Sequence, residues 1–141
     1  MLNWLLGLFP AAKVPEYLRT TLEKEGIGLL EEEIRVTVTY RGYRAPGKYF
    51  GWRRKWCRGS LVLTSPRLVV FAWSQQLINV LFDHPAMGSL NFALERPDCL
   101  SIRFESSHFQ KDSSGKIQCQ VRTPSAPQIV KLLQDRTTHL H

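Results

Sequence analysis

The sequence predicts a mainly β protein: a barrel or sandwich of about seven antiparallel strands, closed by an amphipathic C-terminal helix and preceded by an extra N-terminal helix. Three observations predict it. Apolar and polar residues alternate with a period of two in short segments between residues 34 and 122. Gly, Pro, Asn, Asp and Ser punctuate these segments, and the two outermost segments have a helical period instead.

The first predicted helix covers residues 14–26. Pro15 suits the first turn of a helix, and Gly26 can end the helix in a left-handed cap. Its apolar residues recur at helical spacing and are Tyr17, Leu18 and Leu22. Gly28 and three consecutive glutamates then indicate a boundary, so we expect residues 1–33 to form an N-terminal apolar arm and helix outside the β domain.

The expected strands follow at regular intervals. They cover residues 34–41, 49–56, 60–64, 67–73, 77–82, 90–95, 99–105 and 117–122. The segment at 67–73 is more fully apolar than the others, and Asp112 to Gly115 has the composition of a hairpin turn. Such spacing favours antiparallel strands over alternating β-α units.

The last element returns to a helical period. Its apolar stripe consists of Ala126, Ile129, Val130 and Leu133. Thr123 or Ser125 can cap this helix, and the stripe must be buried against an open end or seam of the sheet. We therefore expect one β domain over residues 34–135 and a frayed tail over 136–141.

One stretch resembles a known family. Residues 59–71 read as a glycine, an aliphatic strand, a Thr-Ser-Pro turn and an Arg-Leu strand, a pattern similar to that of GRAM and bacterial PH-like domains of the PH-like superfold. The resemblance covers about residues 34–135 and implies a further strand, a loop that opens a second sheet, a pair of strands and a closing helix. We expect Arg67 to pin the sheet or pair with a backbone carbonyl rather than touch a ligand.

The net charge of +7 is concentrated in one segment. Residues 1–33 carry −3, and residues 83–141 carry +1. Residues 34–82 hold nine basic side chains and no acidic one. A positive field of this kind attracts anionic partners such as lipid head groups, nucleic acid or an acidic protein.

Within that segment, aromatic and basic residues interleave from Tyr40 to Arg58. The predicted anion- or lipid-binding residues are Arg41, Arg44, Lys48, Arg53, Arg54, Lys55 and Arg58, because guanidinium forks and ammonium groups bind phosphate. The predicted membrane or stacking aromatics are Tyr43, Tyr49 and Trp52. The resemblance points to the same place, since many lipid-binding PH-like domains hold head groups at this early hairpin. In the alternative interpretation, Trp52 and Trp56 are core rings, and Arg53 and Lys55 are solvated on the other face.

Catalytic, metal and cofactor sites find little support. The basic residues around Cys57 would lower its thiol pKa, but no partner base is identifiable. The histidines and cysteines lack metal-ligand spacing, and no phosphate-cradling glycine loop occurs. Three cysteines at these spacings do not form a disulfide framework, so we expect free thiols and a cytoplasmic protein.

The sequence therefore predicts a non-enzymatic binding module that contacts an anionic surface, with membrane lipid as first choice. The alternative is a protein-interaction or oligomerisation domain that uses the N-terminal apolar residues 2–9 and the first predicted helix. This run is too short to span a bilayer, although it could lie at a membrane interface. Nucleic acid is a weaker candidate, because no recognition motif accompanies the charge.

Overall fold

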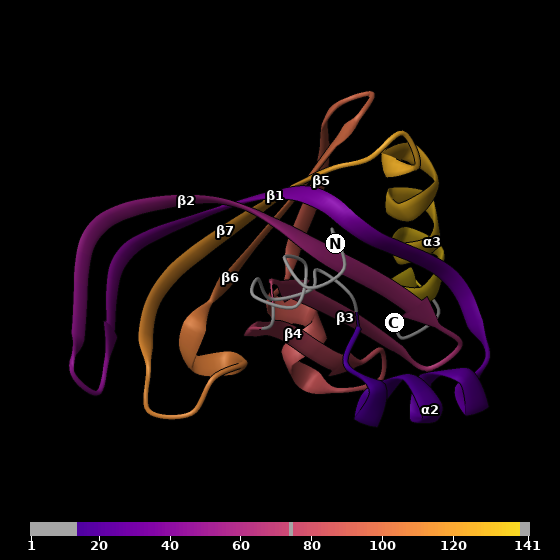
Figure 1. Ribbon diagram of the computed structural model, residues 1–141, viewed down its shortest axis with the longest axis horizontal. Coiled ribbons are helices and arrows are strands. Elements are labelled where there is room, and N and C mark those ends of the chain that lie inside the picture. Colours follow the sequence, from indigo (N-terminus) through magenta and orange to yellow (C-terminus); the bar gives the residue numbers. More distant parts are fainter. Residues whose placement is uncertain (1–13, 74, 139–141) are drawn as a thin grey trace, which may run out of the picture.

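The structure is a computed structural model that describes residues 14–73 and 75–138 (Figure 1). Its elements are α2 (Glu16–Glu25), β1 (Ile27–Ala45), β2 (Lys48–Thr64), β3 (Arg67–Ala72), β4 (Gln75–Leu81), η1 (Pro85–Ser89), β5 (Asn91–Arg96), β6 (Cys99–Glu105), η2 (Ser106–His108), β7 (Ser114–Arg122) and α3 (Ala126–Thr138). The N-terminal residues 2–9, to which we assigned a partner contact, lie outside the described residues.

Seven antiparallel strands form a single sheet in the order β4-β3-β2-β1-β7-β6-β5. The mainly β class, the strand number and both helices confirm the predicted fold class. The sheet is open and not a closed barrel. Strong curvature of β1 and β2 wraps it around one main core instead (Figure 1).

The two longest strands differ from the prediction. β1 and β2 contain 19 and 17 residues, whereas two short strands were expected in place of β2. A break between residues 56 and 60 was expected, but β2 is continuous there and Gly59 lies inside the strand, in close approach to β3. A Cβ atom at this position would lie 2.8 Å from Cγ2 of Val36 and closer still to the carbonyl oxygen of Phe71. The glycine is therefore required by tertiary packing and does not end the strand.

β1 also begins earlier than expected, at Ile27 instead of residue 34. The glutamate run that indicated a boundary contains an irregularity in the pairing with β2, between Glu31 and Ile34. Glu33 there has a φ of 56°, which is the left-handed region. The acidic run is thus a bulge within a continuous strand.

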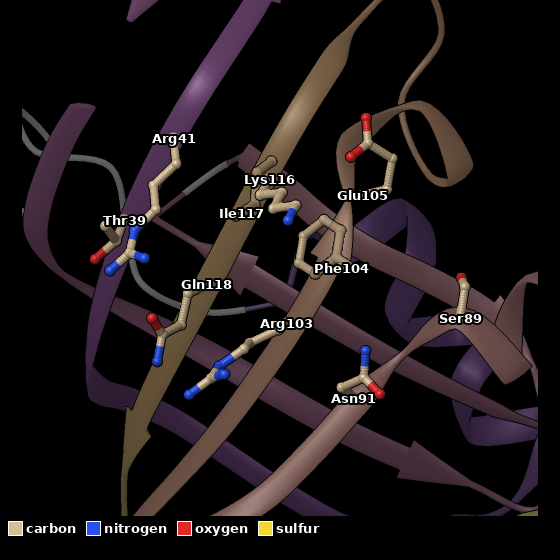
Figure 2. A pocket seen from close by; sticks show the side chains of 10 residues that line it. All are labelled: Thr39, Arg41, Ser89, Asn91, Arg103, Phe104, Glu105, Lys116, Ile117 and Gln118. Carbon is tan, nitrogen blue, oxygen red and sulfur yellow. The ribbon is translucent and has the colours of Figure 1, made fainter. Parts of the chain in front are cut away.

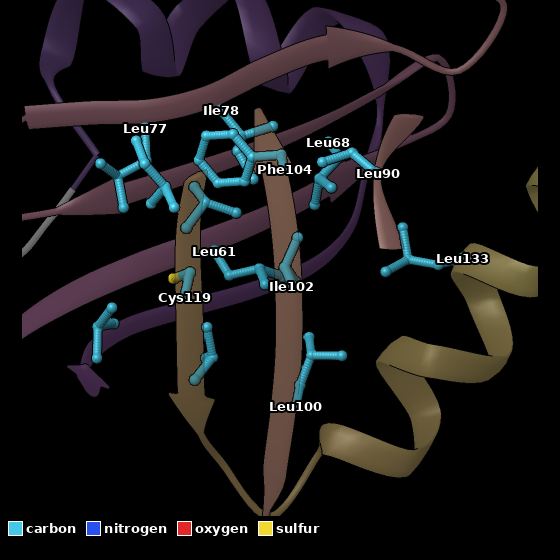
Figure 3. Packing of buried hydrophobic residues seen from close by; sticks show 14 of the residues in the cluster. Leu61, Leu68, Leu77, Ile78, Leu90, Leu100, Ile102, Phe104, Cys119 and Leu133 are labelled. Atoms are coloured by element: carbon cyan, nitrogen blue, oxygen red, sulfur yellow. The ribbon is translucent and has the colours of Figure 1, made fainter. Parts of the chain in front are cut away.

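The end of β2 and the whole of β3 are buried on both faces. Leu61 and Leu68 point into the main core, where Figure 3 shows them with Phe104 of β6 and Leu133 of α3. The alternate residues on the opposite face pack under α2, and they are Val62, Val69 and Phe71. Strands covered on both faces read as continuous apolar runs, which explains the composition of residues 67–73.

Each helix covers part of this sheet. Leu18 and Leu22 of α2 are buried, but Tyr17 is 77% exposed, so its prediction as part of the apolar stripe is wrong. The stripe of α3 is buried as predicted, and this helix packs on β5 and β6. Within the described residues, neither helix has the length and apolar character needed to cross a bilayer.

Arg67 pins the sheet, as predicted, but through side chains. Its Nε donates to both carboxylate oxygens of Glu25, at 3.0 and 3.1 Å, and its Nη1 donates to Oδ1 of Asn79 at 2.9 Å. The half-buried guanidinium thereby joins β3 to β4 and to the last turn of α2.

Candidate anion-binding surface

The distal hairpin, which we define as residues 40–58, extends away from both helices (Figure 1). It comprises the end of β1, the start of β2 and the turn at Pro46 and Gly47. Residues 48–58 of β2 pair only with β1, because β3 pairs with β2 from Gly59 onward. The hairpin therefore has one open edge.

Strand alternation divides the predicted basic cluster between two faces of this hairpin. On the inner face, Arg53 and Lys55 lie opposite the core residues Tyr40 and Val38. On the outer face, Arg54 lies opposite Thr39. The outer set of β2 is Trp52, Arg54, Trp56 and Arg58. The structure thus does not bring the seven predicted basic residues together in one patch.

The outer face exposes large aromatic rings. Trp56 is 73% exposed and Trp52 is 58% exposed, so the interpretation of both as core rings is wrong. The Arg54 guanidinium lies 5.1 Å from the centre of the Trp52 ring, and its Nε donates to Oγ1 of Thr39 at 3.0 Å. Arg58 donates to the backbone carbonyl of Glu33 at 3.2 Å. Arginines and tryptophans therefore alternate along one accessible surface.

The inner face covers an aromatic cluster. The Arg53 guanidinium lies 4.7 Å from the centre of the Phe50 ring, and the Lys55 ammonium lies 5.6 Å from that of Tyr40. Burial lowers the pKa of Lys55 from its usual value, and the charges of Arg53 and Lys48 lower this pKa further. These two cations act as long side chains that cover the rings at the edge of the core.

Tyr43 belongs to this cluster and not to the surface. The ring is buried and lies nearly parallel to Phe50, at 5.8 Å between centres, and its hydroxyl donates to Oε1 of Gln110 at 3.2 Å. The prediction of Tyr43 as a membrane or stacking aromatic is wrong, because its face of β1 is the core face. Trp56, which the prediction left out of the site, is instead its most exposed tryptophan.

The tip of the hairpin carries a third, smaller group. Arg44 and Lys48 are exposed, and Tyr49 is 62% exposed. The Arg44 guanidinium lies 5.1 Å from the centre of the Tyr49 ring. The predicted residues at the tip are thus accessible, as is Arg41 on the outer face of β1.

The thiols differ from the prediction in their electrostatics. Burial raises the pKa of Cys57, and Lys55 offsets this only in part, so the expected lowering of this pKa is wrong. The reason is that Cys57 lies on the inner face, away from Arg54 and Arg58. Burial also raises the pKa of Cys119 to about 12. All three cysteines are free, and burial raises the pKa of each thiol.

Sequence reasoning missed a second feature of the outer face. A concavity of about 440 Å³ crosses β1, β7, β6 and β5, and Arg41, Arg103 and Lys116 line it (Figure 2). Arg41 was predicted as a site residue, but the other two lie more than sixty residues later in the chain. Only the strand register could have placed them beside Arg41.

A serine and a histidine meet beside this concavity. Oγ of Ser89 lies 3.0 Å from Nδ1 of His108 and donates to the carbonyl of Ala86 at 2.6 Å. Because the hydroxyl hydrogen is used in that second bond, His108 donates to Ser89 and does not act as its base. In the part of the chain that the structure describes, no group of three potential metal ligands occurs.

Comparison with protein-family models and with curated proteins finds no match for this chain. The candidate functional sites are therefore the two features of the outer face, namely the aromatic and basic hairpin surface and the concavity beside it.

Proposed function

We propose that this chain is a non-enzymatic binding module whose distal hairpin contacts an anionic surface, with membrane lipid as that surface. The observation that supports this proposal is the outer face of β2, where exposed Trp52 and Trp56 alternate with Arg54 and Arg58. The hairpin tip adds Arg44, Lys48 and Tyr49, and residues 34–82 contain no acidic side chain.

Each component suits a lipid interface. Tryptophan and tyrosine rings settle at the head-group level because they are apolar bodies with a polar group. Arginine binds phosphate through two parallel hydrogen bonds, and each basic group near an anionic bilayer contributes about 1 kcal/mol. A site that had only exposed rings, or only solvated charge, would lack one of these two contributions.

We also propose that residues 34–135 form a PH-like domain of the GRAM or bacterial type. The order of β4, η1, β5, β6, β7 and α3 follows the order that the resemblance implies, although the strands after η1 continue a single sheet and do not open a second one. The close packing of β2 on β3 explains why the resembling stretch begins with a glycine, because any side chain at Gly59 would collide with Phe71 and Val36. An intracellular protein that associates peripherally with a membrane follows from this proposal.

Protein interaction is the second candidate, and the open edge of β2 favours it. On the side that faces away from β1, residues 48–57 present backbone donors and acceptors that pair with no other strand among the described residues. An extended segment of a partner could pair there. Five basic side chains in residues 48–58 oppose non-specific pairing at this edge, which makes lipid the stronger candidate.

Co-sedimentation with vesicles tests the lipid proposal. The unaltered protein should bind vesicles of phosphatidylcholine with phosphatidylglycerol and not phosphatidylcholine alone. Combined Arg54→Gln, Arg58→Gln, Trp52→Ala and Trp56→Ala should weaken binding on the order of a hundred-fold, since two charges and two interfacial rings are removed. These side chains contribute little to the core, so circular dichroism should remain unchanged.

The matched control is Lys111→Gln with Lys131→Gln, two exposed cations away from the hairpin. Lys116 and Arg136 are unsuitable, because Lys116 lines the concavity and Arg136 donates to the carbonyls of Thr64 and Ser65. The control should retain most of the affinity. Absence of vesicle binding at low salt would reject the lipid proposal and leave protein interaction as the better account.

A further inference from the structure

The concavity on the outer face has a lining drawn from several strands. Its volume of about 440 Å³ lies within the usual range of small-molecule sites. Figure 2 shows Arg41 and Thr39 on β1, Gln118 and Lys116 on β7, and Arg103 on β6 around the same hollow. It neighbours the hairpin surface, because Arg41 pairs with Trp52 of β2.

The strand register brings its cations together. Arg41 lies directly opposite Lys116, and Arg103 lies opposite Gln118, the neighbour of Lys116 two residues along the same face. Side chains directly opposite on antiparallel strands have Cβ atoms about 5 Å apart. Three positive groups from distant parts of the sequence therefore surround one space.

These charges are compensated only in part within the described chain. The ion pairs that the described residues form, Arg19 with Glu32 and Arg67 with Glu25, lie elsewhere. Glu105 lies opposite Lys116 in the register, but its Oε1 accepts a hydrogen bond from the backbone N–H of Gly115 at 2.8 Å. Three cations and one carboxylate give the lining a net charge of +2.

Like charges placed opposite each other on a sheet destabilise it unless a counter-charge is present. An anion in the concavity would supply that counter-charge. A doubly charged anion would neutralise the lining, whereas a singly charged anion would leave one positive charge uncompensated.

The polar side chains supply both kinds of hydrogen-bonding group. Oγ1 of Thr39 accepts from Nε of Arg54, which leaves its own hydrogen free to donate. Nε2 of Gln118 donates to Glu95 and to Ser101, both at 3.2 Å, which leaves its carbonyl oxygen free to accept. Donors for anionic oxygens thus lie beside acceptors for hydroxyl groups.

We propose that this concavity binds a phosphate monoester, with Arg41, Arg103 and Lys116 holding the phosphate and Thr39 donating to it. A monoester carries close to two negative charges at neutral pH and accepts the paired bonds of an arginine fork. The oxygens of Gln118 and Glu105 then receive hydroxyl groups of the molecule that carries the phosphate. This site is independent of the proposed membrane contact.

Isothermal titration with glucose 6-phosphate, at constant ionic strength, tests the site in solution. Saturable binding is expected for the phosphorylated sugar and none for glucose. Arg103→Gln and Lys116→Gln should each lower the affinity about ten-fold, as expected for loss of a charged hydrogen bond. Arg122→Gln, at the other end of β7 and also exposed, is the matched control and should change the affinity less than about two-fold.

A second arm tests a lipid as the source of the phosphate. Vesicles with phosphatidic acid present a monoester, and vesicles with phosphatidylglycerol present a diester. If Arg103→Gln weakens binding to the first and not to the second, while glucose 6-phosphate does not bind, the ligand is a lipid monoester and the proposal holds.

The proposal is overturned if neither probe binds in a manner sensitive to Arg103, or if Arg122→Gln weakens binding as much as Arg103→Gln does. Its failure is distinguishable from failure of the membrane proposal. Arg58→Gln with Trp56→Ala, two outer-face residues that do not line the concavity, should affect phosphatidylglycerol vesicles but not glucose 6-phosphate, and Arg103→Gln should do the reverse.

Discussion

The two halves of the β1–β2 pair belong to the same strands but meet different surroundings. In the proximal half, every residue from Gly59 to Thr64 is buried, with α2 on one face and the main core on the other. In the distal half, residues 48–58 have an open edge and an exposed outer face. The same two strands thus pass from a doubly covered sheet into a projecting hairpin.

The two halves therefore differ in what they contribute to the stability of the fold and to the proposed binding. Burial of apolar area stabilises the proximal half, where Leu61, Val62 and Leu63 of β2 are fully buried. The outer face of the distal half contributes little burial, so its tryptophans and arginines are free to serve contact with a partner. Substitutions should therefore separate the two halves, with effects on unfolding in one and on binding in the other.

The largest contrast is expected between two glycines of β2. Gly59→Ala places a methyl group against the Phe71 carbonyl and 2.8 Å from the Val36 side chain, so β2 and β3 must separate. We expect a loss of about 4 kcal/mol or more in the free energy of unfolding. At Gly51 an added Cβ has its nearest contact at 3.8 Å, with the Tyr49 hydroxyl, and Gly51→Ala should change stability little. Urea denaturation measures both, and equal losses would contradict the contrast.

A smaller contrast is expected between two large apolar residues of the same strand. Leu61 is fully buried in the main core, and Leu61→Ala should cost about 3 kcal/mol of unfolding free energy. Trp56 lies five residues earlier and is mostly exposed, so Trp56→Ala should cost below about 0.5 kcal/mol while weakening vesicle binding. Thermal or urea unfolding beside co-sedimentation separates these effects. A large loss of stability in Trp56→Ala would mean that this ring packs as part of the folded structure and would contradict its role as a contact residue.

Within the distal half, the two faces should differ in their response to salt. Arg54→Gln with Arg58→Gln removes two outer charges, worth about 2 kcal/mol or thirty-fold in affinity for an anionic bilayer. Arg53→Gln with Lys55→Gln removes two inner charges that lie about 10 Å farther from a bilayer docked on the outer face. Because the Debye length at physiological salt is about 8 Å, the inner pair should matter much less.

At low salt the Debye length grows to about 30 Å, and the two double variants should then lose similar affinity. Co-sedimentation at both ionic strengths measures this convergence. If the inner pair matters more at physiological salt, then the hairpin docks through the opposite face.

Local periodicity could predict most elements of this fold. The period of two between residues 34 and 122 identified the strands, and the helical stripe from Ala126 to Leu133 identified α3. It could not predict the length of β2, because Gly59 reads locally as a break. Its actual role depends on the carbonyl of Phe71, which only the folded arrangement brings near.

The candidate site was predictable in composition but not in orientation. A period of two separates Arg53 and Lys55 from Arg54 and Arg58, yet it does not say which set is on the core face. The alternative interpretation assigned Trp52 and Trp56 to the core, and the structure places them outward because the hairpin extends beyond the main core. Arg103 and Lys116 could not be predicted, since their nearness to Arg41 depends on the register of β1, β7 and β6.

The smallest effect is expected at the inner face of the distal half and only at alkaline pH. Burial, and then the neighbouring Tyr43, Cys57 and Cys119, raise the pKa of Tyr40 from 10.0 to about 12, although Arg53 lowers it. The folded state therefore keeps this proton after the unfolded state has lost it. Stability from this group is fully present below pH 10 and falls as the pH rises from 10 to about 12.

Urea denaturation of the unaltered protein and of Tyr40→Phe, at several pH values between 9 and 12, measures the contribution. The unaltered protein should lose stability more steeply above pH 10 than the variant, because phenylalanine has no proton to lose. Identical slopes would mean that Tyr40 ionises equally easily in both states. The ring would then be hydrated, and Arg53 and Lys55 would not cover a buried aromatic cluster. Arg53 and Lys55 would then be ordinary solvated charges of the hairpin. Neutralising these two residues should then weaken vesicle binding as much as neutralising Arg54 and Arg58.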